Sequence, residues 1–153
     1  MKCRRQTGYL LALCGLLAAC GAKNPQAGKA NGPVPLNSAQ SIQIKRRLAE
    51  IAGQANGAAP AEIDSDTRLD GAKAGPGLKL TTMYTLVNSE SDGMNSATFA
   101  AKLAPVIRKG SCENTDLRPL IDRGVVVVLE YSGSNGKPLA SLSIDRATCA
   151  TLK

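Results

Sequence analysis

The sequence predicts an α+β fold: an α-β-β-α-α-β-β sandwich with helices mainly on one face of an antiparallel four-stranded sheet and one disulfide. Three observations support this prediction. Apolar residues recur at helical spacing near the start of the domain, they alternate with polar residues over 78–87, and two β-rich runs flank Asn135-Gly136. We expect a single globular domain over residues 37–153, which is long enough for one hydrophobic core.

The first helix is expected to begin at Ser38, whose side chain can cap its N-terminus. The stretch "GQANGAAP", which starts at Gly53, should end it. Four apolar residues share one face of this helix: Ile44, Leu48, Ile51 and Ala52. The cluster Lys45-Arg46-Arg47 projects outward and is interpreted as a solvated helix face, with attraction to anionic lipid or lipopolysaccharide as the alternative.

Two strands and a turn follow the first helix. A short strand is expected around 67–73, then an "AGPG" turn, and then a longer strand over 78–87. Four residues of the longer strand lie on one face because side chains alternate along a strand: Leu78, Leu80, Tyr84 and Leu86. We expect this face to pack against the helices.

Two helices are expected in the middle of the domain. Asn95 or Ser96 caps the first, and its apolar residues at helical spacing are Phe99, Leu103, Val106 and Ile107. Pro105 lies inside that pattern and should shorten or kink the helix. After Cys112, "NTDLRPLIDRG" predicts a short helix that Gly124 stops.

The C-terminal segment predicts a β-hairpin with Asn135-Gly136 as its two-residue turn. Ser134 then pairs with Lys137, and three apolar pairs follow on one side of the hairpin: Val127 with Ile144, Leu129 with Leu142, and Tyr131 with Ala140. A slip of one residue would move every side chain to the opposite face, so the pattern fixes the register.

The other face of the sheet is predicted to be half apolar. Its apolar residues are Met83, Val87, Val126, Val128 and Leu139. If this face is open, it is a candidate partner surface. If the first helix covers it, it is simply part of the interior, and the sequence favours neither alternative.

The N-terminus predicts a secretory signal over residues 1–19. Lys2, Arg4 and Arg5 precede an apolar run that is shorter than the ~20 residues of a membrane-spanning helix. The run ends in "LAACG", which resembles the lipobox of bacterial lipoproteins. That resemblance implies cleavage before Cys20, lipid on its sulfur, and a lipid-anchored place in the cell outer membrane, facing the periplasm. The alternative is an ordinary cleavable signal.

Residues 20–36 are predicted to be a flexible tether, because they are rich in Gly, Ala, Pro and Asn and carry no apolar periodicity. The whole chain has a formal net charge of +7. The processed chain loses three basic residues and no acidic one, so its net charge is +4. This scattered excess, with one Phe and no Trp, argues against nucleic acid as a partner.

Two cysteines remain after processing and lipidation, Cys112 and Cys149, and they predict one structural disulfide in an exported chain. A zinc site would need more ligands, and the chain has no histidine. Redox-active pairs usually lie closer together in a Cys-x-x-Cys motif.

The residue inventory argues against an enzyme and against a small-molecule cofactor. Histidine, the commonest general base, is absent, and neither a Gly-x-Ser-x-Gly motif nor a phosphate-binding loop occurs. The stretch from Asp64 onward fails as a calcium loop, since Arg68 and Gly75 occupy ligand positions. Asp64, Asp66 and Asp70 lack the spacing and aromatic platform expected of a glycosidase. We therefore expect a non-catalytic binding module.

The pattern from Phe99 to the ending "SIDRATC" resembles the C-terminal half of the AspS-type pilotins, small lipoproteins of type II secretion systems. The resemblance covers about the last third of the chain and implies a disulfide between its two cysteines. It also implies a protein partner in the envelope, because family pilotins bind a short helix at the end of a secretin subunit and guide it along the lipoprotein route. The alternatives are a periplasmic inhibitor or immunity lipoprotein against a toxin or wall hydrolase, and an envelope structural lipoprotein.

Overall fold

A computed structural model describes residues 36–152 of the chain. The predicted signal peptide, Cys20 and all but the last residue of the predicted tether lie outside the described residues. The order of elements after residue 36 is helix, three strands, a short 3-10 turn, two helices, two strands and a final helix.

The described residues form one five-stranded sheet in the order β1-β2-β3-β4-β5. The strands are β1 (Ala61–Glu62), β2 (Thr67–Gly75), β3 (Lys79–Leu86), β4 (Val126–Gly133) and β5 (Pro138–Ile144). Neighbouring strands are antiparallel except β3 and β4, which run parallel from Lys79↔Val126 to Leu86↔Gly133. The α+β class is confirmed. The sheet differs from the prediction in having a fifth strand and in being mixed. It is mixed because the long segment between β3 and β4 returns the chain to the end of the sheet at which β3 begins, so that β4 runs parallel to β3.

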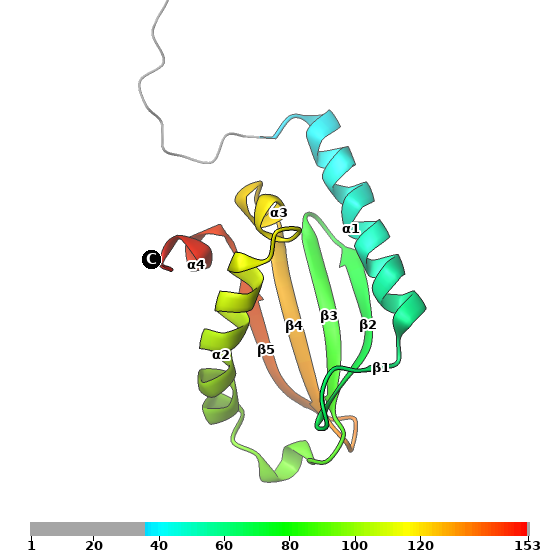
Figure 1. Cartoon of the computed structure of the whole chain (residues 1–153), viewed down its shortest axis with the longest axis vertical. Coiled ribbons are helices and arrows are strands. Elements are labelled where there is room, and N and C mark those ends of the chain that lie inside the picture. The colour runs from blue at the N-terminus through cyan, green and yellow to red at the C-terminus, as the bar shows by residue number, and fades with distance from the viewer. Residues whose placement is uncertain (1–35, 153) are drawn as a thin grey trace, which may run out of the picture. The chain divides into compact units, whose positions relative to one another are not determined.

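All helices lie on one side of this sheet, as predicted (Figure 1). They are α1 (Ser38–Ala58), α2 (Ser96–Glu113), α3 (Arg118–Asp122) and α4 (Arg146–Ala150), with the 3-10 turn η1 (Ser91–Gly93) before α2. Helix α1 packs along β2, and α2 packs along β5 at the other edge. The sequence interpretation did not include α4 or η1.

The N-cap of helix α1 is one residue earlier than the predicted Ser38, and the helix ends later than predicted. Its N-cap is Asn37, whose side chain accepts a hydrogen bond from the amide of Gln40, and the Gln40 side chain completes a capping box. The helix passes through Gly53, which is exposed and has no heavy atom near its missing Cβ. A mid-helix glycine costs only about 1 kcal/mol, and contacts before and after it offset that cost.

The contact that extends α1 is made by Asn56. Its side-chain oxygen accepts a hydrogen bond from the amide of Ala72 at 2.7 Å, and its side-chain nitrogen donates to the carbonyl of Ala72 at 3.0 Å. Ala72 lies beyond the reach of β1, which pairs only with Arg68 and Leu69. Asn56 therefore provides hydrogen-bond partners for the backbone amide and carbonyl of Ala72 in β2, and it attaches the end of α1 to the sheet.

The C-terminal hairpin has the predicted register through Val127↔Ile144, Leu129↔Leu142 and Tyr131↔Ala140. Its turn is different. The amide of Gly133 donates to the carbonyl of Lys137, and Gly136 has φ +72°, so the loop has three residues and a glycine in the left-handed region. The resulting irregularity pairs Ser132 with Pro138 and leaves Leu139 out of the ladder.

The core lies between the helices and the sheet. Its least exposed large side chains come from α1, β3, α3 and the start of β4: Leu48, Leu80, Ile121 and Val125. Pro105 does not end α2, which continues to Glu113. Val106, which the sequence placed on the apolar face of that helix, is 66% exposed. The core therefore uses Phe99, Leu103 and Ile107 from α2.

The predicted disulfide between Cys112 and Cys149 is confirmed, with a Cα–Cα distance of 5.4 Å. It joins the end of α2 to α4, and both cysteines are buried. The bond therefore fixes the crossover helix against the end of the hairpin.

We predict that replacing both cysteines by alanine lowers the free energy of unfolding by about 4 kcal/mol, because the unfolded chain gains the freedom of an open loop. Urea denaturation followed by circular dichroism measures this. Adding reductant to the unmutated chain should cause a similar loss. An unchanged denaturation midpoint in both experiments would contradict a stabilising role for the bond.

We also predict that Asn56→Ala destabilises the fold by about 2 kcal/mol, because it removes two hydrogen bonds from a partly buried edge of β2. Gln54→Ala, on the exposed side of the same helix, is the matched control and should shift the urea midpoint little. Equal effects of the two substitutions would show that helix propensity, rather than the contact with Ala72, matters at this end of α1.

Candidate partner-binding groove

The sequence-predicted partner surface lies on the face of the sheet that carries no described helix. Met83, Val87 and Val126 are half-buried and Val128 is 9% exposed, yet none of them packs against the core of the domain. Helix α1 packs on the opposite face, so the alternative in which it covers these residues is wrong. The neighbours of these residues on that face include threonines, serines and the charged Glu130, which pairs with Met83 in the strand register, so the surface is only weakly apolar.

Leu139 is the exception among the predicted surface residues. It is 6% exposed and belongs to the hydrophobic core. The irregularity between β4 and β5 leaves this residue without a strand partner, and a bulged residue is freed from the usual alternation of side chains. The placement of Leu139 on the open face is therefore wrong.

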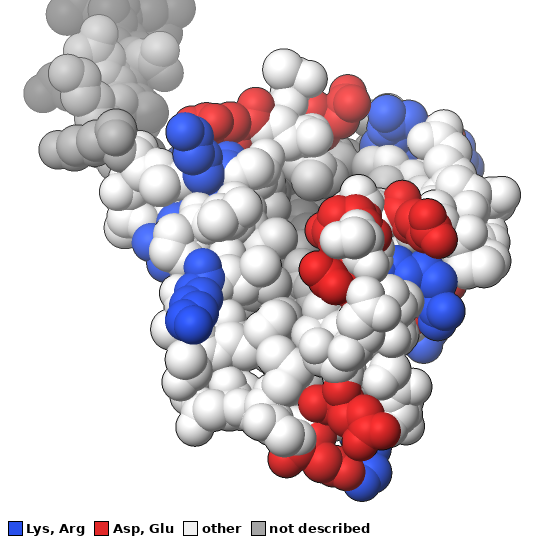
Figure 2. All heavy atoms as spheres, turned by 60° about the horizontal axis from the view of Figure 1, so that its bottom comes forward, with Lys and Arg blue, Asp and Glu red and all other residues white. Residues whose placement is uncertain are grey.

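The helix side of the sheet carries a groove that was not predicted. Helix α1 contacts β2 and the near part of β3, whereas α2 contacts β5, α3 and α4. The two long helices therefore stand apart, with β3 and β4 between them (Figure 1). Figure 2 shows a hollow on this side of the molecule, with mostly uncharged atoms around it and acidic side chains along one of its sides.

Half-buried apolar side chains that pack against the core are available on both walls of this groove. Helix α1 supplies Ile51 and Ala55, and α2 supplies Phe99, Leu103 and Ile107. These positions recur at helical spacing because each helix turns one stripe toward the sheet. We use the name helix groove for the surface formed by these five residues and Tyr84 of β3.

Every aromatic residue of the described chain lies at the helix groove. Tyr84 and Tyr131 stand side by side on the parallel strands β3 and β4, with ring centroids 5.1 Å apart and nearly parallel planes. Phe99 of α2 meets Tyr131 edge-on at 5.5 Å. Such pairs contribute about 1 kcal/mol each beyond the area that they bury. The stack therefore joins the floor of the groove to its α2 wall.

The two tyrosine hydroxyls supply polar groups to this apolar floor. Neither forms a hydrogen bond within residues 36–152. Burial raises the pKa of Tyr131 to about 12, and the nearby Tyr84 and Asp64 raise it in the same direction. Tyr131 is therefore a neutral phenol at physiological pH, able to donate a hydrogen bond to a bound carbonyl or carboxylate.

Acidic residues lie in the β1–β2 loop (residues 63–66), near the end of the helix groove that is at the bottom of Figure 1. The backbone amide of Asp66 donates to the Asp64 carboxylate at 2.9 Å, which is the main reason that the pKa of Asp64 is lowered. The side-chain amide of Asn88 donates to the carbonyl of Ser65 and to the Asp66 carboxylate. The hydrogen bonds of these two carboxylates therefore hold the β1–β2 loop in place.

The pKa values of Tyr131 and Asp64 both move away from neutrality, where a general acid or base works best. Within residues 36–152 no cluster of three or more metal-ligating side chains is present. No helix in the same range is long and apolar enough to cross a bilayer.

Comparison with known proteins identifies the fold. Neither a protein-family model nor a curated protein sequence matches the chain. Three solved structures are similar to it. A Pseudomonas aeruginosa protein described as secreted has a TM-score of 0.59 at 18% identity, covering 74% of this chain and 99% of the other.

The other two structures are pilotins of type II secretion systems. EpsS of Vibrio vulnificus has a TM-score of 0.59 at 16% identity, covering 74% of this chain and 97% of its own. AspS of Vibrio cholerae has a TM-score of 0.56 at 17% identity, covering 71% and 94%. The similarity predicted from the last third of the sequence therefore extends in structure over most of the described domain. At these identities it shows a shared fold.

We predict that Tyr131 ionises near pH 12, so ultraviolet titration of phenolate absorbance should resolve a late transition. Tyr131→Phe should remove this late transition. An unfolded tyrosine ionises near pH 10, so the free energy of unfolding should be unaffected below that pH and should fall between pH 10 and 12. If Tyr131→Phe instead removed phenolate absorbance that develops near pH 10, the burial of Tyr131 would be contradicted.

Proposed function

We propose that this chain is a non-catalytic, lipid-anchored binding protein of the bacterial outer membrane, and that it acts as a pilotin-like chaperone for a secretin subunit. The observation that carries the proposal is an apolar groove between two helices on a pilotin-like fold. The lipid at Cys20, predicted from the lipobox, would deliver the bound subunit to the membrane.

The helix groove suits an amphipathic helix as its occupant. A helix with side chains is about 10–12 Å across and presents one apolar stripe, with anchors at positions i, i+3, i+4 and i+7. Ile51 and Ala55 on one wall and Leu103 and Ile107 on the other are each four residues apart, so the groove offers matching stripes. Aromatic residues on its floor are the type most often found at binding hot spots.

The acidic loop at one end of the helix groove suggests where the basic residues of the partner lie. The acidic β1–β2 loop lies at the lower end of the groove, and the phenol of Tyr131 is a hydrogen-bond donor nearby. We infer that basic residues of the bound helix lie beside Asp64, because opposite charges orient a partner as it docks.

In the alternative function as an inhibitor or immunity protein, the loop between β3 and α2 is the segment that could protrude into another protein. This loop is fastened to the hairpin turn. The amide of Ser134 donates to the carbonyl of Ser89 at 2.9 Å, and the Ser91 hydroxyl donates to the side chain of Asn135 at 3.1 Å. These hydrogen bonds restrain the loop, so it is poorly suited to insertion into a cleft of another protein. The helix groove, in contrast, is well suited to binding a helix.

We predict that Leu103→Asp weakens binding of a secretin C-terminal peptide by about 30-fold, since it places a charge in an apolar contact of hot-spot type. Val106→Asp is the matched control, because it introduces the same charge on the same helix at a residue that is 66% exposed. Fluorescence anisotropy with a labelled peptide measures both, using residues 20–153 with Cys20→Ser.

The α1 wall of the helix groove offers an equivalent pair of test and control variants. Ile51→Asp should weaken binding by a similar factor, whereas Ile42→Asp, at an exposed position of α1, should not. Equal losses at the wall and control positions, or no binding of any secretin C-terminal peptide by the unmutated chain, would refute the proposed function. Circular dichroism of each variant separates loss of binding from loss of folding.

A further inference from the structure

Charge is divided between the two ends of the described domain. We call the end at which the chain emerges, beside Leu36, the tether end, and the opposite end, with the β1–β2 loop, η1 and the β4–β5 turn, the distal end. The distal end carries seven acidic and two basic residues: Glu62, Asp64, Asp66, Asp70, Glu90, Asp92, Glu130, Arg68 and Lys137. Figure 2, with this end turned forward, shows acidic side chains gathered here.

The tether end has the opposite balance. Its seven basic residues are Lys45, Lys73, Lys79, Lys109, Arg118, Arg123 and Arg146, and its four acidic residues are Glu113, Asp116, Asp122 and Asp145. The formal charge is therefore +3 at the tether end and −5 at the distal end. The sequence alone does not show this division, because residues of both signs are scattered along the chain.

Ion pairing increases the difference in unpaired basic charge between the two ends of the domain. Both basic residues of the distal end are paired, Arg68 with Asp70 and Lys137 with Asp92. At the tether end only Arg118 is paired, with Asp122 at 3.0 Å. Among the described residues, the other six basic side chains of that end form no ion pair. Their charges are therefore available to an external anionic surface.

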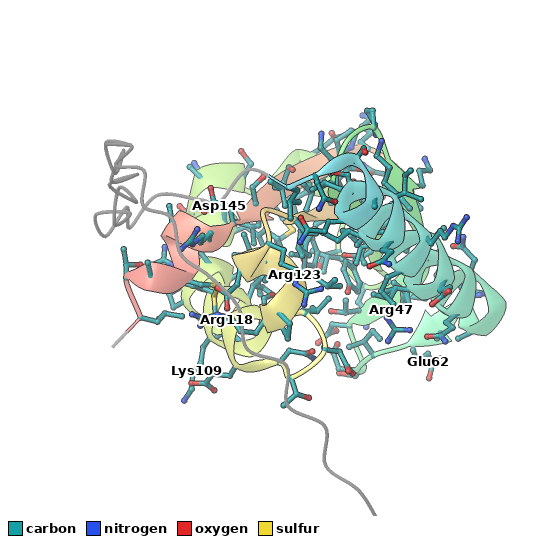
Figure 3. The ribbon with its side chains drawn as sticks, turned by 90° about the horizontal axis from the view of Figure 1, so that it is seen from above. Arg47, Glu62, Lys109, Arg118, Arg123 and Asp145 are labelled. Atoms are coloured by element: carbon teal, nitrogen blue, oxygen red, sulfur yellow. A yellow bond between two sulfur atoms is a disulfide. The ribbon has the colours of Figure 1, made fainter. Side chains whose placement is uncertain are left out.

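These basic residues come from separate segments that meet at one end. Arg123 borders a pocket with Leu36 and Ile44 of the chain entry and α1. Lys45 borders another with the β2–β3 turn, and Lys79 follows that turn directly. Seen from above, Arg123 lies between α1 and Arg118, and Lys109 lies beyond Arg118 (Figure 3). The basic residues therefore spread across the whole end.

We propose that the tether end docks on an anionic phospholipid surface, so that the domain rests on its membrane with the distal end pointing away. The inference rests on the lipid anchor of the proposed function. Cys20 lies 16 residues before Leu36, which limits the separation to about 55 Å even when that segment is fully extended. Tethering keeps the end that emerges first close to the headgroups.

The charge balance would then orient the tethered domain. The basic end is attracted to phosphatidylglycerol headgroups and the acidic end is repelled, over a range of about 10 Å at 0.1 M salt. The acidic end of the helix groove would face away from the bilayer, where a partner can reach it. This orientation places the membrane and the partner at opposite ends of one body.

Vesicle binding tests the proposal with residues 20–153 carrying Cys20→Ser, which retains the whole described domain and has no lipid. The probe is a vesicle of 30% phosphatidylglycerol and 70% phosphatidylethanolamine at low salt. We expect binding that salt reverses and that phosphatidylcholine vesicles do not support. The triple variant Lys79→Glu, Lys109→Glu, Arg123→Glu should bind about 100-fold more weakly, at about fivefold per charge removed from the surface.

The matched control reverses three basic residues outside the tether end: Arg68→Glu, Lys102→Glu and Lys137→Glu. It changes the net charge equally and should weaken vesicle binding by no more than about threefold, because these charges lie farther from the surface. Equal losses in the two triples, no binding to anionic vesicles, or equally tight binding of an anionic oligonucleotide would each overturn the proposal.

The same variants separate this proposal from the proposed function. The tether-end triple should retain its affinity for a secretin C-terminal peptide in solution, because none of its residues lines the helix groove. If the peptide binds and the vesicles do not, only the membrane orientation fails. If the vesicles bind and no peptide does, the partner assignment fails and the orientation stands.

Discussion

The parallel pairing of β3 with β4 is the constraint on which the rest of the structure depends. A parallel neighbour cannot be reached by a tight turn, so the chain must cross back along the sheet before β4 can begin. Here that crossover carries η1, α2 and α3, and it brings the chain from Leu86 at the distal end to Val126 at the tether end. Helix α2 therefore packs along β5 and leaves the central strands without a long helix on them. With α1 on the other edge, the groove between the helices follows from this strand order.

The two walls of the groove are fastened by different chemistry. The disulfide between Cys112 and Cys149 holds the end of α2, and the side chain of Asn56 holds the end of α1 against the edge of β2. The aromatic stack of Tyr84, Tyr131 and Phe99 connects the floor to the α2 wall. A site held at both walls needs little ordering when a partner binds, and such preorganisation strengthens affinity without new contacts. Rigidity of this kind would suit a protein that receives a short helix.

The local structure was largely predictable from the sequence, but the assembly was not. Alternation fixed the register of the hairpin, because Leu129 and Leu142 can share a buried face in only one alignment. The disulfide followed from counting the cysteines that remain in an exported chain. In contrast, the direction of β4 relative to β3 depends on how a long crossover packs, and no local pattern encodes that. The bulge that turns Leu139 inward arises from turn geometry, and the contact of Asn56 with Ala72 depends on a strand edge that exists only after folding. The groove was missed for the same reason, although Phe99, Leu103 and Tyr84 were recognised as members of their apolar faces.

We expect the partner to bind on the helix side of the sheet rather than on its open face. The helix groove has half-buried apolar walls and an aromatic floor, whereas the open face sets Met83, Val126 and Val128 among threonines, serines and Glu130. The most direct measurement is NMR chemical-shift mapping of residues 20–153, carrying Cys20→Ser, during titration with a secretin C-terminal peptide. We expect the large shifts at Ile51, Tyr84 and Leu103. Shifts confined to Val126, Val128 and their neighbours would contradict the account and would assign the partner to the open face instead.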